Sequence, residues 1–519
     1  MRKAFKKYVL NYILPAVSIS AVSGILTGAV ITLYKFCASK AIMLSETAYH
    51  ILSEKVYLIP VAFVAVFVLA MIYSQCYKKY PNLQGGGIPT SIGILRGLIS
   101  FNWFKNLLGT FALSISSFFV GVPLGNEGPS VQIGTAIGGA SAKLFGRKGV
   151  AWNRYSMTGG ACAGFSVATG APISGILFSV EEAHQRVSPL IIIVSAVSVA
   201  VADITSKILS PMLGVNTALF PEMKHAVLSV KEMWLPVFLG VAFGLFAVAF
   251  LKYYRLINSF CNKKLKNIPQ VYRIFAVFAI TVVIGMFSHS FVSTGHELVL
   301  DLFEESPAVY TLLIILAVRS TLTLCANTNG ITGGLFVPML SIGAVFATLS
   351  AGLMHTAFGV DKEYYALILA LGITASIAGM MKMPLTAVLF SVEALNCHNN
   401  IVPVIMVSAT AYIITEIFKV NSINDVVLEN KVENLNKGKT PQTVEEYVTV
   451  KKGSFAIGKH IRDILWPPSL LVLSLEHDKN ISLGEDEKGE ICEGDTLYVR
   501  YTTFDKNKAK EELSNIIGK

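Results

Sequence analysis

The sequence predicts an all-α protein that crosses a membrane many times, followed by a small α+β domain. Hydrophobic residues make up 53% of the 519 residues and charged residues only 15%, whereas a soluble protein carries about 25% charge. The apolar residues form near-continuous runs, several of which reach the roughly 20 residues that span a bilayer. The runs occupy residues 9–36, 57–74, 106–122, 189–209, 234–251, 273–288, 308–325, 339–358, 364–380 and 401–418.

The basic residues indicate a membrane topology. The net charge of +10 comes from Lys and Arg residues dispersed at the ends of apolar runs, which favours a positive-inside signal over a nucleic-acid surface. The start MRKAFKKY is basic, and Lys78 and Lys79 follow two runs later. The apolar stretch after the start is too long for a cleavable signal peptide. We therefore expect a cytoplasmic N-terminus and no nucleic-acid partner.

The composition also argues against an enzyme, a metal site or a bound cofactor. The seven cysteines and nine histidines are scattered, with no CxxC or HxxxH pair, so neither a disulfide framework nor a metal site is predicted. The sequence contains no P-loop and no nucleophile elbow.

The composition changes near residue 430. The segment 431–442 is polar, charged and contains proline, as linkers are. Residues 443–519 contain short β-branched stretches separated by turn residues, and they end in a helical stretch. We expect a membrane domain at 1–430, a linker at 431–442 and a small cytoplasmic α+β domain at 443–519.

The membrane domain contains an internal duplication. The segment ATGAPISGILFSVEEA (168–183) is similar to MMKMPLTAVLFSVEAL (380–395). The prolines of this pair, Pro172 and Pro384, lie 212 residues apart, and an upstream pair, Pro129 and Pro338, lies 209 apart. Two pairs at nearly one offset predict two repeats, at about 10–215 and 230–430. Transporters built this way often have inverted repeats and broken helices around a substrate site.

Three Gly/Pro segments are predicted to start helices inside the membrane. In residues 85–93, 125–134 and 333–343, glycines come first, then a proline, then an apolar run. Proline favours the first helical turn and glycine permits a sharp approach. Helix starts within a membrane present free N–H groups and a positive dipole end, which together bind an anion. For each segment taken alone, the alternative is an ordinary loop at the lipid surface rather than a helix start inside the membrane.

These segments resemble the GSGIP, G(K/R)EGP and GxFxP motifs of the CLC family of chloride channels and transporters. GILFSVEEAH (175–184) also resembles the family segment that ends in paired glutamates. The resemblance covers about residues 10–430. It implies inverted repeats of tilted, broken helices, a homodimer with one pore per subunit, and a multi-pass protein of the cell membrane with both termini in the cytoplasm. The C-terminal domain resembles TrkA-C domains, which implies regulation through a small-molecule ligand.

The resemblance assigns roles to two acids. Glu127 aligns with the gating glutamate that carries a proton, and Glu182 with the inner proton-transfer glutamate of the exchangers. A carboxylate facing helix N–H groups mimics the anion and competes with it, and once displaced and desolvated it takes up a proton. We expect Glu181 and Glu393 to pair with nearby cations or water. The implied anion-binding residues are Gly85, Gly86, Gly87, Ile88, Pro89, Gly125, Asn126, Gly128, Pro129, Gly334, Leu335, Phe336, Val337, Pro338 and Asn424.

Three positions depart from the family pattern. Gly86 replaces the serine of GSGIP, Asn126 replaces the basic residue before the glutamate, and Asn424 lies where an inner-gate tyrosine is usual. Both central hydroxyl groups are therefore missing. We expect weaker central anion binding and looser coupling.

Four transport functions follow as hypotheses. Chloride/proton exchange leads, because both glutamates are present. A passive chloride channel of the voltage-gated type is the second, and fluoride/proton antiport is the third, because fluoride exporters also depart from the first two motifs. The TrkA-like tail suggests a cation transporter. Helix N-termini present the wrong partial charge to a cation, however, and no TVGYG-type filter occurs.

Overall fold

The computed structural model describes residues 9–146, 149–221, 223–477, 480–483 and 490–518. Within these residues, nine helices are long and apolar enough to cross a membrane. A 3₁₀ turn extends the N-terminal end of four of them, α3, α10, α15 and α17. The nine are α2 (Leu14–Glu54), α3 (Ile59–Lys79), α9 (Pro189–Leu213), α10 (Trp234–Lys264), α11 (Gln270–Phe287), α13 (Val309–Thr328), α14 (Phe336–Phe358), α15 (Tyr365–Met380) and α17 (Ile401–Ile417).

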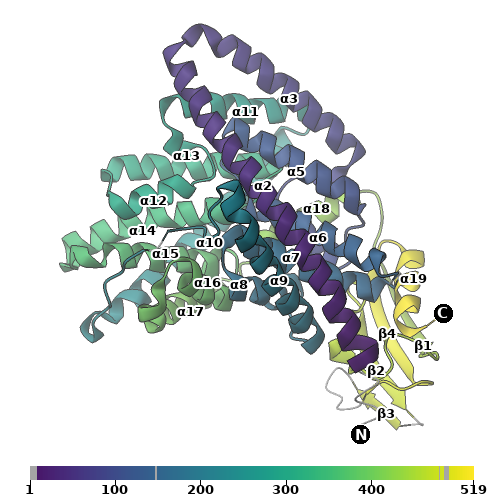
Figure 1. Ribbon diagram of the computed structural model, residues 1–519. Helices are drawn as coiled ribbons and strands as arrows, with labels where there is room; N and C mark the ends of the chain where they lie inside the picture. The colour runs from purple at the N-terminus through teal and green to yellow at the C-terminus, as the bar shows by residue number, and fades with distance from the viewer. Residues whose placement is uncertain (1–8, 147–148, 222, 478–479, 484–489, 519) are drawn as a thin grey trace.

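Further helices are less apolar or shorter, and several begin inside the bundle. Figure 1 shows helices α6 and α7 among the longer ones, which run at varied tilts, and most residues of both helices are buried. These helices are α4 (Gly87–Leu95), α5 (Trp103–Val120), α6 (Glu127–Leu144), α7 (Val150–Thr169), α8 (Pro172–Phe178), α12 (His296–Glu304), α16 (Pro384–Ala394) and α18 (Ile423–Leu435). The predicted multi-pass helical fold is confirmed, and α4, α6 and α14 begin within the three Gly/Pro segments.

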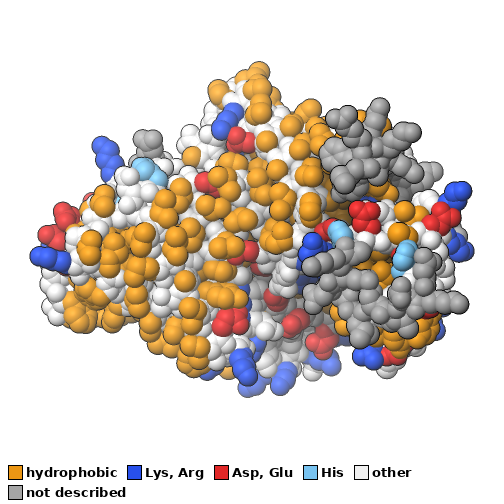
Figure 2. Space-filling model, turned by 90° about the horizontal axis from the view of Figure 1, so that it is seen from below, with side chains coloured by type: hydrophobic (Ala, Val, Ile, Leu, Met, Phe, Trp, Pro, Cys, Tyr) orange, Lys and Arg blue, Asp and Glu red, His pale blue; other side chains and the backbone are white. Residues whose placement is uncertain are grey.

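The surface of the helical part suits a bilayer. Figure 2 shows hydrophobic side chains over much of the face that the helices form, with charged side chains more frequent towards its margins. Large apolar residues such as Val61, Val64 and Ile405 are exposed on transmembrane helices. Exposed apolar side chains cost free energy in water but not in the hydrocarbon core of a bilayer.

The C-terminal residues fold as one antiparallel sheet and a helix. The strands are β1 (Gln442–Thr449), β2 (Leu471–His477), β3 (Asn480–Leu483) and β4 (Thr496–Thr503), in the order β1-β4-β2-β3. Helix α19 (Lys506–Ile517) contributes Leu513 and Ile516 to a core shared with Leu497 and Val499 of β4. Helix α18 extends to Leu435, so the connection to the sheet is residues 436–441 rather than beginning at 431.

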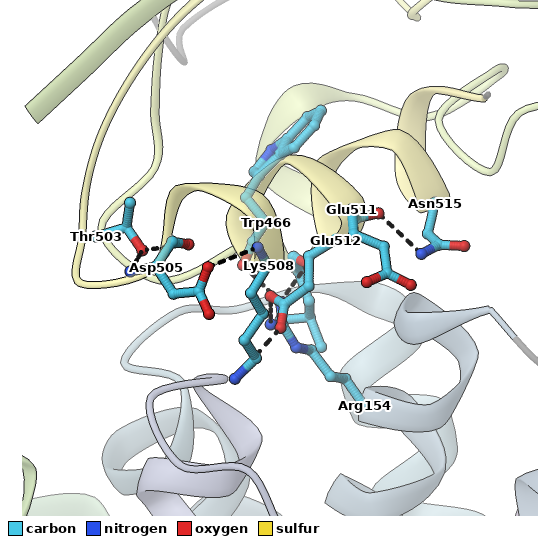
Figure 3. A network of polar contacts seen from close by, with 9 residues as sticks. Arg154, Trp466, Thr503, Asp505, Lys508, Glu511, Glu512 and Asn515 are labelled. Carbon is cyan, nitrogen blue, oxygen red and sulfur yellow. Dashed lines mark hydrogen bonds and ion pairs between the residues drawn. The ribbon is translucent and has the colours of Figure 1, made fainter. Parts of the chain in front are cut away.

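The sheet domain packs directly against the membrane helices. Figure 1 shows the strands beside the ends of α2 and α7, and Ala151 of α7 joins the hydrophobic core of the domain. The Tyr12 hydroxyl donates to the Ile457 carbonyl at 3.3 Å. In Figure 3, Arg154 reaches from α7 towards α19, where its Nη2 meets Glu512 Oε2 at 2.6 Å. Arg154 Nη1 also donates to the carbonyl of Trp466 at 2.9 Å.

Candidate anion and proton site

The three predicted helix starts meet at one place. The loops before α6 and α14 form an antiparallel bridge, in which Gly125 and Gly334 exchange two N–H···O bonds of 2.7 Å. A Cβ on Gly87, at the start of α4, would lie 1.9 Å from the Gly128 carbonyl oxygen, and one on Gly128 would lie 2.6 Å from the Gly334 Cα. Glycine is therefore required at these contacts, because any side chain would collide with backbone.

This meeting point collects free N–H groups and positive dipole ends from both repeats. Each α-helix leaves its first N–H groups unpaired, and three helix starts together favour a small anion. All of the predicted residues at these starts are buried except Asn126, which is half-buried. They are Gly85, Gly86, Gly87, Ile88 and Pro89 at α4, Gly125, Asn126, Gly128 and Pro129 at α6, and Gly334, Leu335, Phe336, Val337 and Pro338 at α14.

Glu127 places a carboxylate inside this site. It is the first residue of α6 and is fully buried. A Cβ on Gly125 would lie 2.4 Å from its Oε2, and the carboxylate faces the amides of Glu127 itself and Val337. Neither carboxylate oxygen completes a hydrogen bond with any described residue. A buried acid without a completed hydrogen bond is costly.

An aromatic cluster at the start of α14 connects the two repeats. Phe336, at the start of α14, makes edge contacts with Phe165 at 5.1 Å and with Phe390 at 5.4 Å between ring centroids. Phe165 in turn stacks on Phe178 at 5.4 Å. Phe178 and Phe390 are the equivalent residues of the duplicated FSVE segments. The duplication therefore brings corresponding side chains of the two repeats to the same aromatic cluster.

Glu182 is a second buried acid, in the π-helical turn that follows α8. Its side chain is 2% exposed, and its Oε1 accepts a hydrogen bond from Asn424 Nδ2 at 3.0 Å. Arg96 donates to the carbonyls of Glu182 and Ala183 at 2.8 and 3.0 Å, which fixes this turn. The structure thus places Asn424 as the hydrogen-bond partner of the predicted proton-transfer acid.

Glu181 and Glu393 bind backbone N–H groups, not the cations or water that were expected. Glu181 accepts from the amides of Leu385 and Thr386 at 2.8 and 2.7 Å, at the start of α16. Glu393, its equivalent in the second repeat, accepts from the amides of Ile173 and Ser174 at 2.7 and 2.9 Å, at the start of α8. Each repeat therefore caps a helix of the other, because a carboxylate satisfies free helical N–H groups.

Replacement of either cap is expected to destabilise the contact between the repeats. Glu393→Gln exchanges one acceptor oxygen for a donor that faces N–H groups, so it should cost about 2 kcal/mol, the size of a hydrogen bond to a charged group. Thermal unfolding followed by size-exclusion chromatography measures the loss. Glu416→Gln, at an exposed position that pairs with Lys382, is the matched control and should cost no more than roughly 1 kcal/mol. Equal effects of the two substitutions would contradict the capping role.

Two cations, the half-buried Lys431 and the buried Arg319, were not predicted. The Lys431 ammonium donates to the Gln84 carbonyl at 2.9 Å and to Thr90 Oγ1 at 2.6 Å, beside the start of α4. Arg319 is 1% exposed and donates to the Val292 carbonyl at 2.7 Å. No carboxylate of the described residues pairs with either cation. Arg319 stands in an apolar run, a position that by itself indicates a functional residue. Lys431 falls in the expected linker and gives no such signal.

A third cation acts on Glu127 from α2. The Lys35 ammonium donates to the carbonyls of Val167 and Thr217 at 3.1 and 3.3 Å, and its charge acts on the Glu127 carboxylate. It therefore brings positive charge towards Glu127, whose neighbour Asn126 stands where a basic residue was expected.

Comparisons with known proteins agree with this geometry. The chain is 25% identical over 426 residues to an H(+)/Cl(-) exchange transporter ClcA of Vibrio vulnificus, covering 80% of this chain and 90% of that relative. It is 26% identical over 406 residues to an H(+)/Cl(-) exchange transporter ClcA of Salmonella typhimurium, covering 76% and 84%.

Two solved structures share the fold. A slow cyanobacterial Cl-/H+ antiporter superposes with a TM-score of 0.74 at 23% identity, covering 81% of this chain and 99% of that one. A CLC-type fluoride/proton antiporter superposes with a TM-score of 0.65 at 18% identity, covering 78% and 96%. The family model described as voltage gated chloride channel matches residues 67–416. The chain therefore belongs to the CLC family of voltage gated chloride channels.

Proposed function

We propose that this protein exchanges chloride for protons across the cell membrane, with Glu127 as the gate and Glu182 as the inner proton-transfer acid. The observation that carries the proposal is the buried Glu127 carboxylate among three converging helix starts. The names of the relatives support exchange as the reaction. We further propose a homodimer with one anion path in each subunit and with both termini in the cytoplasm.

Coupling follows from competition for one site. Chloride and the Glu127 carboxylate are both attracted to the N–H groups that start α6 and α14, and two negative groups repel each other there. When chloride enters, the carboxylate leaves, loses the N–H groups that favour its charge and takes up a proton. When chloride leaves, the proton is released and the carboxylate returns. Glu182 passes protons between Glu127 and the side of the membrane on which Asn424 lies.

Simultaneous measurement of chloride and proton movement in liposomes tests this reaction. Chloride flux without proton movement would leave a passive chloride channel on the same fold. Fluoride/proton antiport is a second candidate, because Gly86 and Asn126 depart from the chloride pattern and one structural neighbour is a CLC-type fluoride/proton antiporter. Comparison of fluoride and chloride efflux from the same vesicles decides between the two anions.

We also propose that residues 443–519, joined by a linker within 431–442, are a TrkA-C-like regulatory domain that binds a small ligand. A continuous set of contacts supports coupling to transport. Glu512 of α19 pairs with Arg154, the Arg154 carbonyl accepts from Thr158 Oγ1, and Thr158 contacts His184 Nε2 at 2.8 Å. His184 follows the turn that holds Glu182.

Glu512→Gln is expected to weaken the docking of this domain. The Arg154 side chain is 3% exposed, and a buried charge that loses its partner destabilises by roughly 3–5 kcal/mol. We expect faster proteolytic cleavage within residues 436–441 and a changed transport rate. Glu511→Gln, at the exposed neighbouring position, is the control and should leave both unchanged. An unaltered cleavage rate in the Glu512 variant would show that the ion pair does not hold the domain.

A further inference from the structure

The side-chain amide of Asn327 lies next to the position that a serine side chain would occupy at Gly86. Gly86 is the N-cap residue of α4, with φ −67° and ψ 138°. The three heavy atoms nearest to a Cβ built on it are Pro89 Cδ at 3.4 Å, Asn327 Nδ2 at 3.6 Å and the Gly333 carbonyl oxygen at 3.6 Å. These are ordinary contact distances, so the site has room for a small side chain. The nearest polar side-chain atom to that position is the Asn327 amide nitrogen.

The Asn327 amide is buried and its NH₂ group is unpaired. Asn327 lies in the last turn of α13 and is 5% exposed. Its Oδ1 accepts from the Tyr254 hydroxyl at 3.4 Å, while its Nδ2 has no hydrogen-bond partner among the described residues. The Tyr254 hydroxyl therefore turns the amide oxygen towards α10 and the NH₂ group towards Gly86. A buried donor left unpaired costs free energy, and such a group in a native fold calls for an explanation.

We propose that the Asn327 NH₂ group is an anion ligand that replaces the serine hydroxyl absent at Gly86, with a halide-sized monovalent anion as its acceptor. This proposal rests on the proposed anion transport. The donor stands at the N-cap of α4, where free N–H groups and the dipole already favour negative charge. Tyr254 is a positioning residue, because its hydroxyl fixes which end of the amide faces the anion.

The surroundings carry further positive charge to the same place. The Lys431 ammonium binds Thr90 Oγ1, and Thr90 Oγ1 in turn donates to the Gly86 carbonyl at 3.0 Å. The Gly86 carbonyl, which would repel an anion, therefore accepts a hydrogen bond from Thr90. The Asn327 NH₂ group has no hydrogen-bond partner among the described residues, and a small anion would complete its hydrogen bonding.

Equilibrium chloride binding to the purified full-length protein, by calorimetry, tests the proposal. Asn327→Ala is expected to lower chloride affinity roughly tenfold or more, since a hydrogen bond to a charged group is lost. Gly86→Ser in the Asn327→Ala background is expected to restore most of that affinity, because the hydroxyl returns to the same position. The two substitutions should therefore be strongly non-additive. Unchanged affinity in Asn327→Ala, or a loss that Gly86→Ser does not restore, would overturn the proposal.

Three further variants separate ligation from folding. Asn327→Asp keeps the shape but offers only acceptors, so it should bind chloride more weakly than Asn327→Ala does; wild-type affinity would show that the carbonyl end faces the site. Tyr254→Phe should weaken binding less than Asn327→Ala. Asn329→Ala removes a buried amide that donates to the Cys325 carbonyl and should bind chloride as the wild type does. The binding test and the transport test can fail separately. Wild-type chloride flux without proton movement would contradict exchange, but the chloride affinities of these variants would still decide whether Asn327 is a ligand.

Discussion

Glu127→Gln is expected to abolish proton movement while chloride continues to cross the membrane. Glutamine has the size of glutamate, but it is uncharged and cannot bind and release a proton. It therefore does not compete with the anion for the helix N–H groups, and it cannot couple anion binding to proton uptake. The fully buried position of Glu127 among three helix starts makes this the substitution with the largest expected effect. The measurement is the ratio of proton to chloride flux in liposomes, which should fall to background.

The control for this variant is an acid outside the site. Glu305→Gln removes a carboxylate from an exposed position after α12, and the flux ratio should stay at the wild-type value. A Glu127→Gln protein that still moves protons against chloride would remove this residue from the mechanism. A variant that moves neither ion would indicate instead that the displaced carboxylate is needed to open the anion path.

Glu182→Gln is expected to slow proton movement by roughly 100-fold, the size of the contribution of a positioned proton donor. In the wild type, Glu182 Oε1 accepts from Asn424 Nδ2 at 3.0 Å. Glutamine keeps an oxygen that can accept this hydrogen bond, so the turn should keep its shape. Chloride binding at the helix starts should be unchanged, because Glu182 contacts none of them among the described hydrogen bonds. The proton flux and the chloride affinity are measured on the same preparation.

Two outcomes would contradict this role for Glu182. One is proton flux at the wild-type rate, and the other is a loss of chloride affinity that equals the loss of proton flux. Glu429→Gln is the matched control, because Glu429 is an exposed acid on α18, the helix that carries Asn424. It should alter neither quantity.

The sequence allowed the helix starts and their convergence to be predicted because both depend on local rules and on the duplication. Glycine and proline restrict where a helix begins, and the repeat places equivalent segments opposite each other. The antiparallel bridge between Gly125 and Gly334 is the direct result of that relation. Burial of Glu127 follows from the same pattern, whereas the role expected of Glu182 rested on the family resemblance alone.

The remaining features depend on contacts between distant residues. Glu181 caps α16 and Glu393 caps α8 across more than 200 residues, and no local pattern distinguishes such a cap from an ordinary helix-end acid. In the sequence, Asn327 is an ordinary polar residue near a helix end. Only the structure shows that its amide lies beside Gly86. Lys431 lies in a charged stretch that is typical of a linker, and only α18 brings it to the start of α4.

The most direct test of the account is the movement of both ions by the wild-type protein. Purified protein is reconstituted in liposomes with a chloride gradient and no initial pH gradient, and both ions are followed together. The account predicts that chloride moving down its gradient drives protons in the opposite direction until the two gradients balance. Chloride movement with no change in proton concentration would contradict exchange and with it the proposed roles of Glu127 and Glu182.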